Sequence, residues 1–287
     1  MFQNDRTADH VFQSRAVPQG RNLEDDPEVM VHQQIARLKF FEQEAGWNGC
    51  SVLDFGCGSG FNSQLLGSAA SYLGFDAFAD VVHLASRLYP SHRFRRADGC
   101  DPGLDLGRFE RVICCEVLEH VPDMETFVRN IARHLEPGGK AFITTPNVQV
   151  FSNGHRPSPV NREHIHELDL AEFRALLAPF GEVAVYGQRF RRPELAVAWR
   201  EEVAGKIALL EHGRRWVAPP PPPEWQRRLR SIPPVRLAWS VYRDRILAPQ
   251  RHQRARRARP YSWRDFEISA QLDDALWFCA ICSTPAA

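Results

Sequence analysis

Apolar residues recur along this chain either at helical spacing or in short runs typical of strands, and the two patterns alternate from one segment to the next. In residues 25–47, helical spacing behind acidic residues that suit a helix N-terminus is shown by Val29, Met30, Ile35, Leu38 and Phe41. Later segments with helical spacing predict helices over residues 62–71, 81–89, 122–135 and 168–180. Short apolar runs predict strands over residues 51–55, 72–76, 92–98, 111–116, 140–145, 182–186 and 274–282. Strands that alternate with helices in this way predict a parallel sheet with helices on both faces.

The fold class that follows is a doubly wound α/β domain with an insertion before its last strand. The insertion differs in composition from the rest of the chain. Between Trp225 and Arg264, twelve arginines stand against a single acid, although the whole chain has a formal net charge of +1. Pro219–Pro223 come before that stretch and favour a stiff polyproline spacer. We therefore expect a helical N-terminal segment (residues 1–46), a core domain (47–190 with 271–287) and a basic helical insertion (191–270).

Composition excludes several classes of protein. Hydrophobic residues make up 44% of the chain and charged residues 25%, which is typical of a globular protein. The longest apolar runs fall short of the roughly 18 residues that a membrane span needs. The first residues lack the charged and then apolar layout of a signal peptide. Seven cysteines without the spacing of a disulfide framework indicate a reducing compartment, so we expect a soluble cytoplasmic protein.

A glycine-rich loop, in the run VLDFGCGSG, follows the first predicted strand. Gly56 and Gly58 allow a tight turn and a close approach of the backbone to a ligand. Phe61 stands where a dinucleotide fingerprint has its third glycine, which disfavours a nicotinamide or flavin site. Asp76 ends the second strand, where a carboxylate can accept both hydroxyls of a ribose, and Asp98 ends the third. Together these positions predict a nucleoside-binding edge of the sheet.

The motifs VLDFGCGSG, GFD, CCEVLEHV and LEPGGKAFITTPN make the chain resemble class I S-adenosylmethionine-dependent methyltransferases over about half of its length. The resemblance implies a Rossmann-like seven-stranded sheet of order 3-2-1-4-5-7-6, in which strand 7 is antiparallel. It also implies S-adenosylmethionine as the cofactor. By the matching motifs, the methionine end would lie at Asp54, Gly56 and Gly58, the ribose at Asp76, and the adenine beside Asp98 and Gly99. Cys57 and Glu116 belong to the same implied cofactor site.

Glu116, Glu119 and His120 form a Glu-x-x-Glu-His segment just after the fourth predicted strand. If the segment forms one helical turn, these three side chains share a face and converge. Two adjacent carboxylates repel each other unless a cation lies between them, and oxygen with nitrogen ligands suits Mg²⁺, Mn²⁺ or Zn²⁺. His164, in a later histidine-rich run, is available as a fourth ligand. Two alternatives stay open: His120 acts as a metal-free general base, or Glu119 is only a helix-start charge.

The same segment resembles two branches of the family that are linked to a divalent metal. One comprises ubiquinone-pathway O-methyltransferases, and the other comprises enzymes that methylate the terminal 2′-hydroxyl of small RNAs. In the second branch a later His precedes a Phe by nine residues, as His164 precedes Phe173 here. The resemblance thus implies Mg²⁺ or Mn²⁺ at Glu116, Glu119, His120 and His164, with His120 and Glu119 as the catalytic residues.

We expect methyl transfer to a hydroxyl of a small molecule or saccharide. Residues 144–147 read Thr-Thr-Pro-Asn, which resembles a run in glycan and natural-product methyltransferases. The Asn/Asp-Pro-Pro-Tyr run associated with amino-group methylation of bases is absent. An RNA 2′-O-methyltransferase is one alternative, and a non-catalytic cofactor-binding partner protein is another. The arginines of the insertion could contact RNA, an anionic lipid-linked substrate or a membrane surface, or could pair with acids as a helical cap. We expect residues 191–270 to shape the acceptor site.

Overall fold

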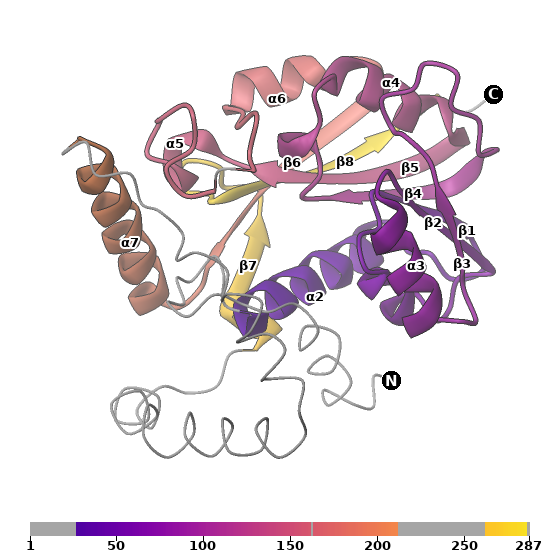
Figure 1. Cartoon of the computed structure of the whole chain (residues 1–287), viewed down its shortest axis with the longest axis horizontal. Helices are drawn as coiled ribbons and strands as arrows, with labels where there is room; N and C mark the ends of the chain where they lie inside the picture. Colours follow the sequence, from indigo (N-terminus) through magenta and orange to yellow (C-terminus); the bar gives the residue numbers. More distant parts are fainter. Residues whose placement is uncertain (1–26, 162, 212–261, 286–287) are drawn as a thin grey trace, which may run out of the picture.

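The computed structural model describes residues 27–161, 163–211 and 262–285, which form one sheet flanked by helices (Figure 1). The described strands are β1 (Ser51–Phe55), β2 (Ser71–Asp76), β3 (Arg93–Arg96), β4 (Phe109–Cys115), β5 (Leu135–Pro146), β6 (Glu182–Phe190), β7 (Phe266–Ser269) and β8 (Trp277–Ser283). Their order across the sheet is β3-β2-β1-β4-β5-β8-β6-β7. The strands β1 to β5 pair in parallel, while β8 runs antiparallel between β5 and β6. The predicted α/β class is therefore confirmed.

The centre of the sheet is apolar because helices or loops cover both of its faces. In β4, Val112, Ile113 and Cys114 are fully buried, and β1 buries Val52 and Leu53 in the same way. Such continuous apolar runs are what predicted these two strands. Since β2, β1 and β4 are parallel neighbours, their carboxyl ends meet at one edge of the sheet, and the loops that follow them lie together there.

The expectation of seven strands is wrong by one, because β7 adds an eighth at the edge of the sheet. β6 continues to Phe190, past its predicted end at Tyr186, and the added residues pair with β7 from Gly187↔Ser269 to Phe190↔Phe266. The four residues of β7 read Phe-Glu-Ile-Ser soon after the arginine-rich stretch, so their apolar and polar alternation is too short to predict a strand. A strand this short forms because its neighbour already presents a row of free backbone groups.

Helices cover both faces of the sheet, as the alternation of the two patterns predicted (Figure 1). They are α2 (Pro27–Glu44), α3 (Ala79–Leu88), α4 (Met124–Arg133), α5 (Val148–Phe151), α6 (Leu170–Leu176) and α7 (Pro193–Glu211), with the short 3₁₀ helices η1 (Phe61–Leu65), η2 (Leu118–His120) and η4 (Trp263–Asp265). On one face, Phe127 of α4 and Phe173 of α6 share a core cluster with the strands. On the other face, Leu38 and Phe41 of α2 share a second cluster, in which Phe41 stacks on Phe142 at 4.9 Å between ring centroids.

Two local predictions are wrong. The helix expected over residues 62–71 is only the five-residue η1, and β2 already begins at Ser71. The segment between them contains Gly67 and Ser68, which are poor helix formers. β5 begins at Leu135 and not at residue 140 as predicted, so Pro-Gly-Gly at residues 137–139 lies inside the strand, where the register against β4 shifts. A strand can accommodate Pro-Gly-Gly in this way because a local irregularity bends it without terminating it.

Only the two ends of the predicted insertion are described. α7 packs Trp199 against Phe151, Phe190 and Trp277, and β7 joins the sheet. Residues 212–261, which include the prolines and most of the arginines, lie outside the described residues, so the division of the chain into three parts stays a prediction. Among the described residues, no helix combines the length and apolar character that a membrane span requires.

Candidate active site

The loop after β1 holds glycines in backbone conformations that other residues rarely adopt. Gly56 and Gly58 have φ angles of 83° and 53°. A Cβ at Gly56 would lie 2.7 Å from a methyl carbon of Val117, so this position needs glycine for packing. A Cβ at Gly58 would meet nothing within 4 Å, so the backbone there borders open space. The loop therefore has room for a ligand at Gly58.

Asp76, at the end of β2, faces the same loop. Its Oδ2 accepts a hydrogen bond from the Gly58 N–H at 3.0 Å, and its Oδ1 accepts one from the Phe78 N–H at 3.1 Å. An ionised carboxylate has lone pairs left after two such bonds, so it can still accept from other hydroxyl groups. Its predicted role at a ribose is compatible with this geometry and stays a prediction.

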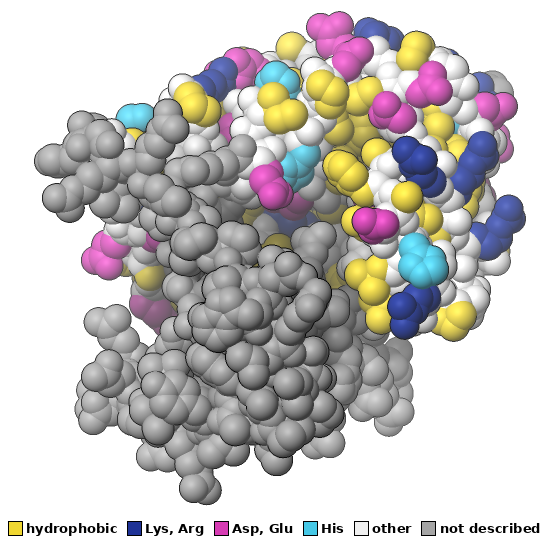
Figure 2. Space-filling view, in the orientation of Figure 1, with side chains coloured by type: hydrophobic (Ala, Val, Ile, Leu, Met, Phe, Trp, Pro, Cys, Tyr) yellow, Lys and Arg dark blue, Asp and Glu magenta, His cyan; other side chains and the backbone are white. Residues whose placement is uncertain are grey.

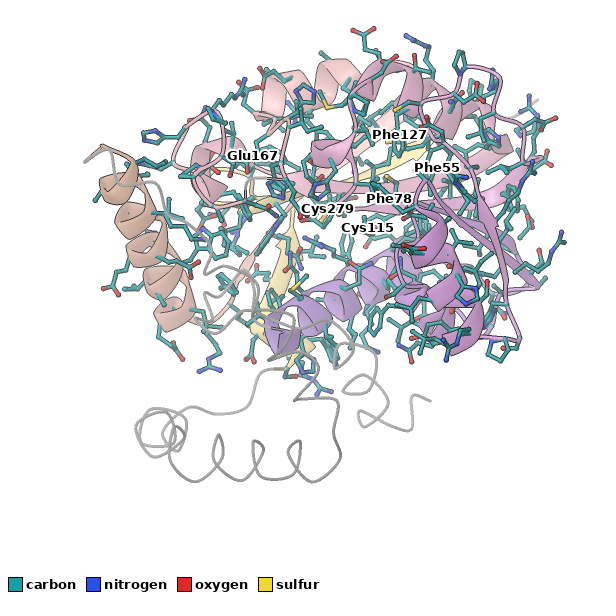
Figure 3. The ribbon with its side chains drawn as sticks, in the orientation of Figure 1. Phe55, Phe78, Cys115, Phe127, Glu167 and Cys279 are labelled. Atoms are coloured by element: carbon teal, nitrogen blue, oxygen red, sulfur yellow. The ribbon has the colours of Figure 1, made fainter. Side chains whose placement is uncertain are left out.

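Phe78 was not predicted from the sequence. It directly precedes α3, and 72% of its surface is exposed, whereas large aromatic side chains are usually well buried (Figure 3). An exposed ring two residues after Asp76 offers a flat apolar face on which a purine can stack. The available signal was a large aromatic residue inside the polar loop that follows the strand-end acid.

Asp54 is buried at the end of β1 and is only 1% exposed. The Tyr72 hydroxyl donates to its Oδ2 at 2.8 Å, and the Asn62 amide donates to both oxygens at 3.1 and 3.2 Å. Burial raises the pKa of Asp54 to about 7, and these two donors oppose the shift. The neighbouring Cys57 is buried as well, and burial raises the pKa of its thiol. Asp54 therefore supports the loop through Tyr72 and Asn62, neither of which was predicted.

Asp98 and Gly99 follow β3 at the adjacent strand end. Oδ1 of Asp98 accepts a hydrogen bond from the Cys100 N–H at 2.9 Å, which closes a tight local turn. Gly99 packs directly against Phe127, so a Cβ there would collide with the ring. Both residues have a local structural role, and their contact with an adenine stays a prediction.

The Glu-x-x-Glu-His segment does not form one helical turn over its whole length. η2 covers only Leu118–His120, whereas Glu116 comes before it with a left-handed φ of 56°. Glu116 instead pairs with Arg37 of α2, whose Nη2 lies 3.2 Å from its Oε1, and it accepts a hydrogen bond from the Thr144 hydroxyl at 2.8 Å. The expected convergence of three side chains on one helical face is therefore wrong.

Arg37 was not predicted to belong to the site. It is 2% exposed, its Nε donates to Gln188 of β6 at 2.7 Å, and its guanidinium lies 5.4 Å from the ring centroid of Trp277. It thus ties α2 to the loop after β4 and to the last strands of the sheet. The available signal was its spacing, because Arg37 lies four residues before Phe41 on the buried face of α2.

Glu119, His120 and His164 form the group of candidate metal ligands within the described residues, and their ligand atoms lie within 4.8 Å of one another. Nδ1 of His120 lies 2.9 Å from the Glu163 carbonyl oxygen and donates to it, while its Nε2 lies 4.0 Å from Oε1 of Glu119. Nδ1 of His164 lies 2.7 Å from Oε1 of Glu167. Both imidazoles are thus held through Nδ1. Nε2 of His120 is left for a ligand, whereas Nε2 of His164 lies 3.0 Å from the amide nitrogen of Asn161 and accepts its hydrogen.

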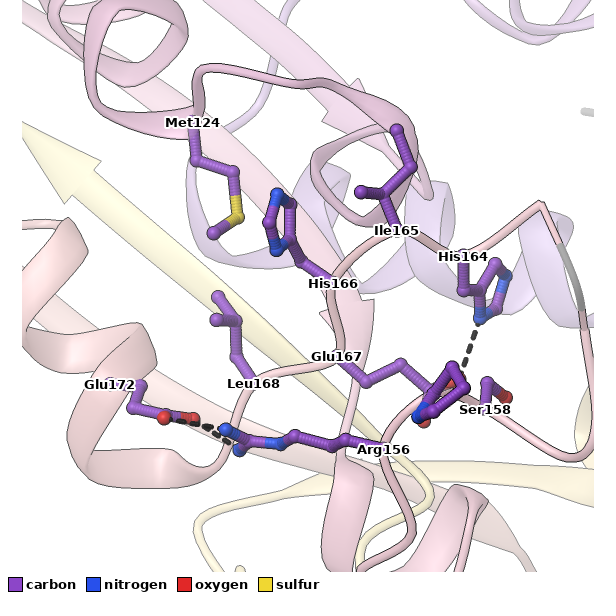
Figure 4. A pocket seen from close by; sticks show the side chains of 10 residues that line it. Met124, Arg156, Ser158, His164, Ile165, His166, Glu167, Leu168 and Glu172 are labelled. Carbon is purple, nitrogen blue, oxygen red and sulfur yellow. Dashed lines mark hydrogen bonds and ion pairs between the residues drawn. The ribbon is translucent and has the colours of Figure 1, made fainter.

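A pocket adjoins this group, against the loop before α6 and the starts of α4 and α6, and His164 is one of the residues that line it (Figure 4). His166 lines that pocket together with Met124 and the ion pair of Arg156 with Glu172. His164 reaches the ligand group and His166 does not. Glu116, which was predicted as one of the four ligands, also lies outside the group.

Glu119 is a buried carboxylate with an oxygen that lacks a partner. It is 1% exposed, Thr145 donates to Oε2 at 3.4 Å, and Oε1 has no hydrogen-bond partner in the described part of the chain. Burial and the nearby Glu116 raise the pKa of Glu119 well above its usual range. Burial also lowers the pKa of His120, which favours a neutral imidazole. The unpartnered Glu119 oxygen and the two imidazoles together offer one oxygen and two nitrogen ligands. This set suits a divalent cation that accepts both kinds of ligand.

Comparison with known proteins identifies the family. A family model described as a methyltransferase domain matches residues 22–185, which is more than half of the chain. The chain belongs to the class I S-adenosylmethionine-dependent methyltransferases. A ubiquinone biosynthesis O-methyltransferase from Coxiella burnetii is 31% identical to this methyltransferase over 180 residues, which is 61% of this chain and 70% of the relative.

Other relatives agree with this assignment. A probable S-adenosylmethionine-dependent methyltransferase from Mycobacterium tuberculosis is 36% identical over 149 residues, which is 50% of this chain and 53% of the relative. Among solved structures, a possible histamine N-methyltransferase from Thermotoga maritima matches at a TM-score of 0.53 and 10% identity, over 89% of this chain and 92% of that one. At such low identity the likeness shows the fold alone. The predicted family and Rossmann-like fold are confirmed.

Proposed function

We propose that this methyltransferase transfers a methyl group to a hydroxyl oxygen of a small molecule, with a divalent cation held by Glu119, His120 and His164. One observation carries the proposal. A buried carboxylate oxygen without a partner among the described residues meets two imidazoles whose Nδ1 atoms are already bonded. Figure 2 shows that this face of the molecule is hollowed beside acidic and histidine side chains. The relative from Coxiella burnetii that is named an O-methyltransferase supports an oxygen acceptor.

We assign cofactor binding to the edge of the sheet after β1 and β2. The open space at Gly58 would receive the sulfonium nucleoside, with its ribose at Asp76 and its adenine on the exposed ring of Phe78. S-adenosylmethionine supplies a methyl group on a positive sulfur, which leaves as a neutral thioether when an oxygen attacks in line. Because that leaving group needs no acid catalysis, the protein has to orient both reactants and remove one proton.

Where the site holds no cation, His120 is positioned to take that proton, because its Nε2 cannot bind a cation and accept a proton at once. Its side chain is 36% exposed, so an acceptor can reach it, whereas Glu119 and His164 are buried. The Glu163 carbonyl holds a hydrogen on Nδ1, which leaves the lone pair of Nε2 available as a base. A cation at the three residues would supply Lewis acidity that lowers the pKa of an acceptor hydroxyl.

A vicinal diol is the acceptor class that suits such a site, because two adjacent oxygens can share one cation. Catechols, sugars and ribose ends carry this group. We also propose that residues 191–270 shape the acceptor site. Trp199 of α7 contacts Phe151 at 4.9 Å between ring centroids, and Phe151 contacts His164 at 5.5 Å, so this segment reaches the ligand group through one aromatic ring.

The test is a methyl-transfer assay with labelled S-adenosylmethionine and a panel of catechols and saccharides. We expect a product heavier by one CH₂ with its new methyl on oxygen. A chelator should abolish activity, and Mn²⁺ or Mg²⁺ should restore it. A methyl group found on nitrogen would contradict the oxygen acceptor. Full activity after chelation would remove the cation from the proposal and leave His120 as a metal-free base.

Methylation of an RNA 2′-hydroxyl is the second candidate. It is favoured by the proximity of His164 to Glu119 and His120, because a later histidine is the feature shared with the branch that methylates small RNAs. The same assay with a short RNA discriminates between the two. Methylation of RNA should fall steeply as salt rises, because phosphate contacts dominate such binding. It should also fall when the arginines outside the described residues are neutralised, namely Arg254, Arg256 and Arg257. Activity on RNA that salt leaves unchanged would contradict this candidate.

A further inference from the structure

Glu167 is a buried carboxylate that belongs neither to the cofactor loop nor to the group of candidate ligands. It is 3% exposed and lies in the loop before α6, three residues after His164. Its Oε1 is 2.7 Å from Nδ1 of His164, which is itself only 7% exposed (Figure 4). Its Oε2 has no hydrogen-bond partner in the described ranges of the chain. Burying such a carboxylate is costly, and the contact with His164 is where that cost is offset.

The two neighbours of the His164 ring specify a single tautomer. An ionised carboxylate only accepts hydrogen bonds, so the contact with Glu167 places the imidazole hydrogen on Nδ1. On the other side of the ring, Nε2 lies 3.0 Å from Nδ2 of Asn161, an amide nitrogen that only donates. Both contacts therefore place the lone pair on Nε2, which is the form of the nitrogen that binds a metal. In this structure that lone pair accepts the Asn161 hydrogen, so a cation bound there replaces this hydrogen bond.

The loop that carries His164 is held to η2 by other bonds. The backbone N–H groups of Ile165 and His166 donate to the carbonyl oxygen of Glu119 at 2.7 and 3.2 Å. These main-chain bonds set the distance between η2 and the loop without any side chain. The carboxylate of Glu167 is therefore not needed to keep the loop in place, and its contact is specific to the imidazole.

We propose that Glu167 is a positioning residue that fixes the His164 ring with the lone pair on Nε2, so that a divalent cation at Glu119 and His120 can replace the Asn161 hydrogen there and is bound more strongly. A carboxylate behind an imidazole ligand orients the ring, selects its tautomer and raises its basicity. His120 has a neutral carbonyl in the corresponding place, so the carboxylate makes His164 the stronger of the two nitrogen ligands. This inference rests on the metal site of the proposed function.

Calorimetric titration of the full chain with Mn²⁺ alone tests the role of Glu167. We expect Glu167→Gln, which keeps the size of the side chain, to bind Mn²⁺ about 10–100-fold more weakly than the unmodified protein. Glu172→Gln is the matched control, because it removes an equal charge from an exposed carboxylate on α6 and retains a residue that can cap the helix. The control should bind Mn²⁺ normally. Normal binding by Glu167→Gln would overturn the inference.

Comparison with His164→Ala separates failure of this inference from failure of the metal site. His164→Ala should weaken Mn²⁺ binding at least as much as Glu167→Gln. If His164→Ala has no effect, the metal site is wrong and the inference falls with it. If His164→Ala weakens binding and Glu167→Gln does not, the metal site stands and the positioning role is wrong.

The tautomer of His164 gives a readout that needs no metal. Nitrogen NMR should show the hydrogen on Nδ1 in the unmodified protein and loss of that preference in Glu167→Gln, whose amide can also donate. The same tautomer in both proteins would overturn the inference. Glu167→Asp keeps the charge but shortens the side chain, so it should also weaken Mn²⁺ binding. Thermal unfolding of each variant establishes that it is folded before binding is compared.

Discussion

The guanidinium of Arg37 lies 3.2 Å from the carboxylate of Glu116, and this pair joins α2 to the loop after β4. Arg37 is almost fully buried, and a buried cation is stable only with a partner of opposite charge. Glu116 supplies that charge from a left-handed backbone conformation, ahead of the turn that carries Glu119 and His120. The pair therefore accounts for the separation of Glu116 from the group of candidate ligands.

Arg37→Met should lower the free energy of unfolding by about 3 kcal/mol, because it leaves Glu116 and the Gln188 amide without their partner. The double variant with Glu116→Gln should recover part of that loss, since no charge is then stranded. Urea denaturation followed by circular dichroism measures both values. Strictly additive losses in the double variant would contradict a direct pairing.

Gly58→Val should abolish detectable binding of S-adenosylhomocysteine. The φ of 53° strains a β-branched residue, and its side chain would enter the open space assigned to the cofactor. Calorimetric titration measures the affinity. Gly67→Ala is the control, because a Cβ at Gly67 also meets nothing within 4 Å but lies away from the motif. Unchanged affinity in Gly58→Val would refute the placement of the cofactor.

Phe78→Ala should weaken binding of S-adenosylhomocysteine by about 1–3 kcal/mol, the range for losing a base stacked on an aromatic ring. Its effect on folding should stay within about 0.5 kcal/mol, because 72% of the side chain is already exposed. Leu88→Ala, which changes another exposed apolar residue at the far end of the helix that Phe78 precedes, should leave binding unchanged. Equal binding by the Phe78 variant and the unmodified protein would exclude Phe78 from the adenine site.

Asp54 should make the folded protein less stable as the pH rises from about 4 to about 7. Its pKa is about 7 in the folded protein, against an ordinary value of 3.8. Between these values the folded state keeps a proton that the unfolded state has released, so the free energy of unfolding falls by up to about 1.4 kcal/mol per pH unit. Asp54→Asn removes this titration, so its stability relative to the unmodified protein should rise over the same interval in urea denaturation. A constant difference would indicate an ordinary pKa.

Removal of residues 215–260 should leave binding of S-adenosylhomocysteine intact and abolish turnover of the acceptor. The glycine loop and Asp76 belong to the core domain, whereas this stretch differs from it in charge and composition. Calorimetry and the methyl-transfer assay on the shortened chain measure the two effects. Loss of both cofactor binding and turnover would indicate that the stretch is part of the core fold.

The sequence by itself determined the parts of the molecule that depend on neighbours in the chain. The apolar run of β4 identified a strand buried on both faces, because burial restricts the residue type at every position of such a strand. Gly56 and Gly58 marked the loop, because a positive φ excludes most side chains. Those two signals, with the acid at the end of β2, indicated the edge of the sheet at which a cofactor is expected, and the motifs CCEVLEHV and LEPGGKAFITTPN completed the resemblance to the family.

Only the tertiary structure decided which distant residues meet. Arg37 contacts Gln188 across 151 positions, and β7 pairs with β6 because that strand presents a free edge. The left-handed backbone of Glu116 breaks the helical face that the spacing predicted, and no sequence propensity marks such a conformation at a glutamate in advance. Hydrogen bonds and ion pairs act over a few ångströms in space, whereas sequence patterns record only the preferences of nearby positions. The partners of Glu119, His164 and Glu167 therefore became visible only when the packed sheet and its loops placed them together.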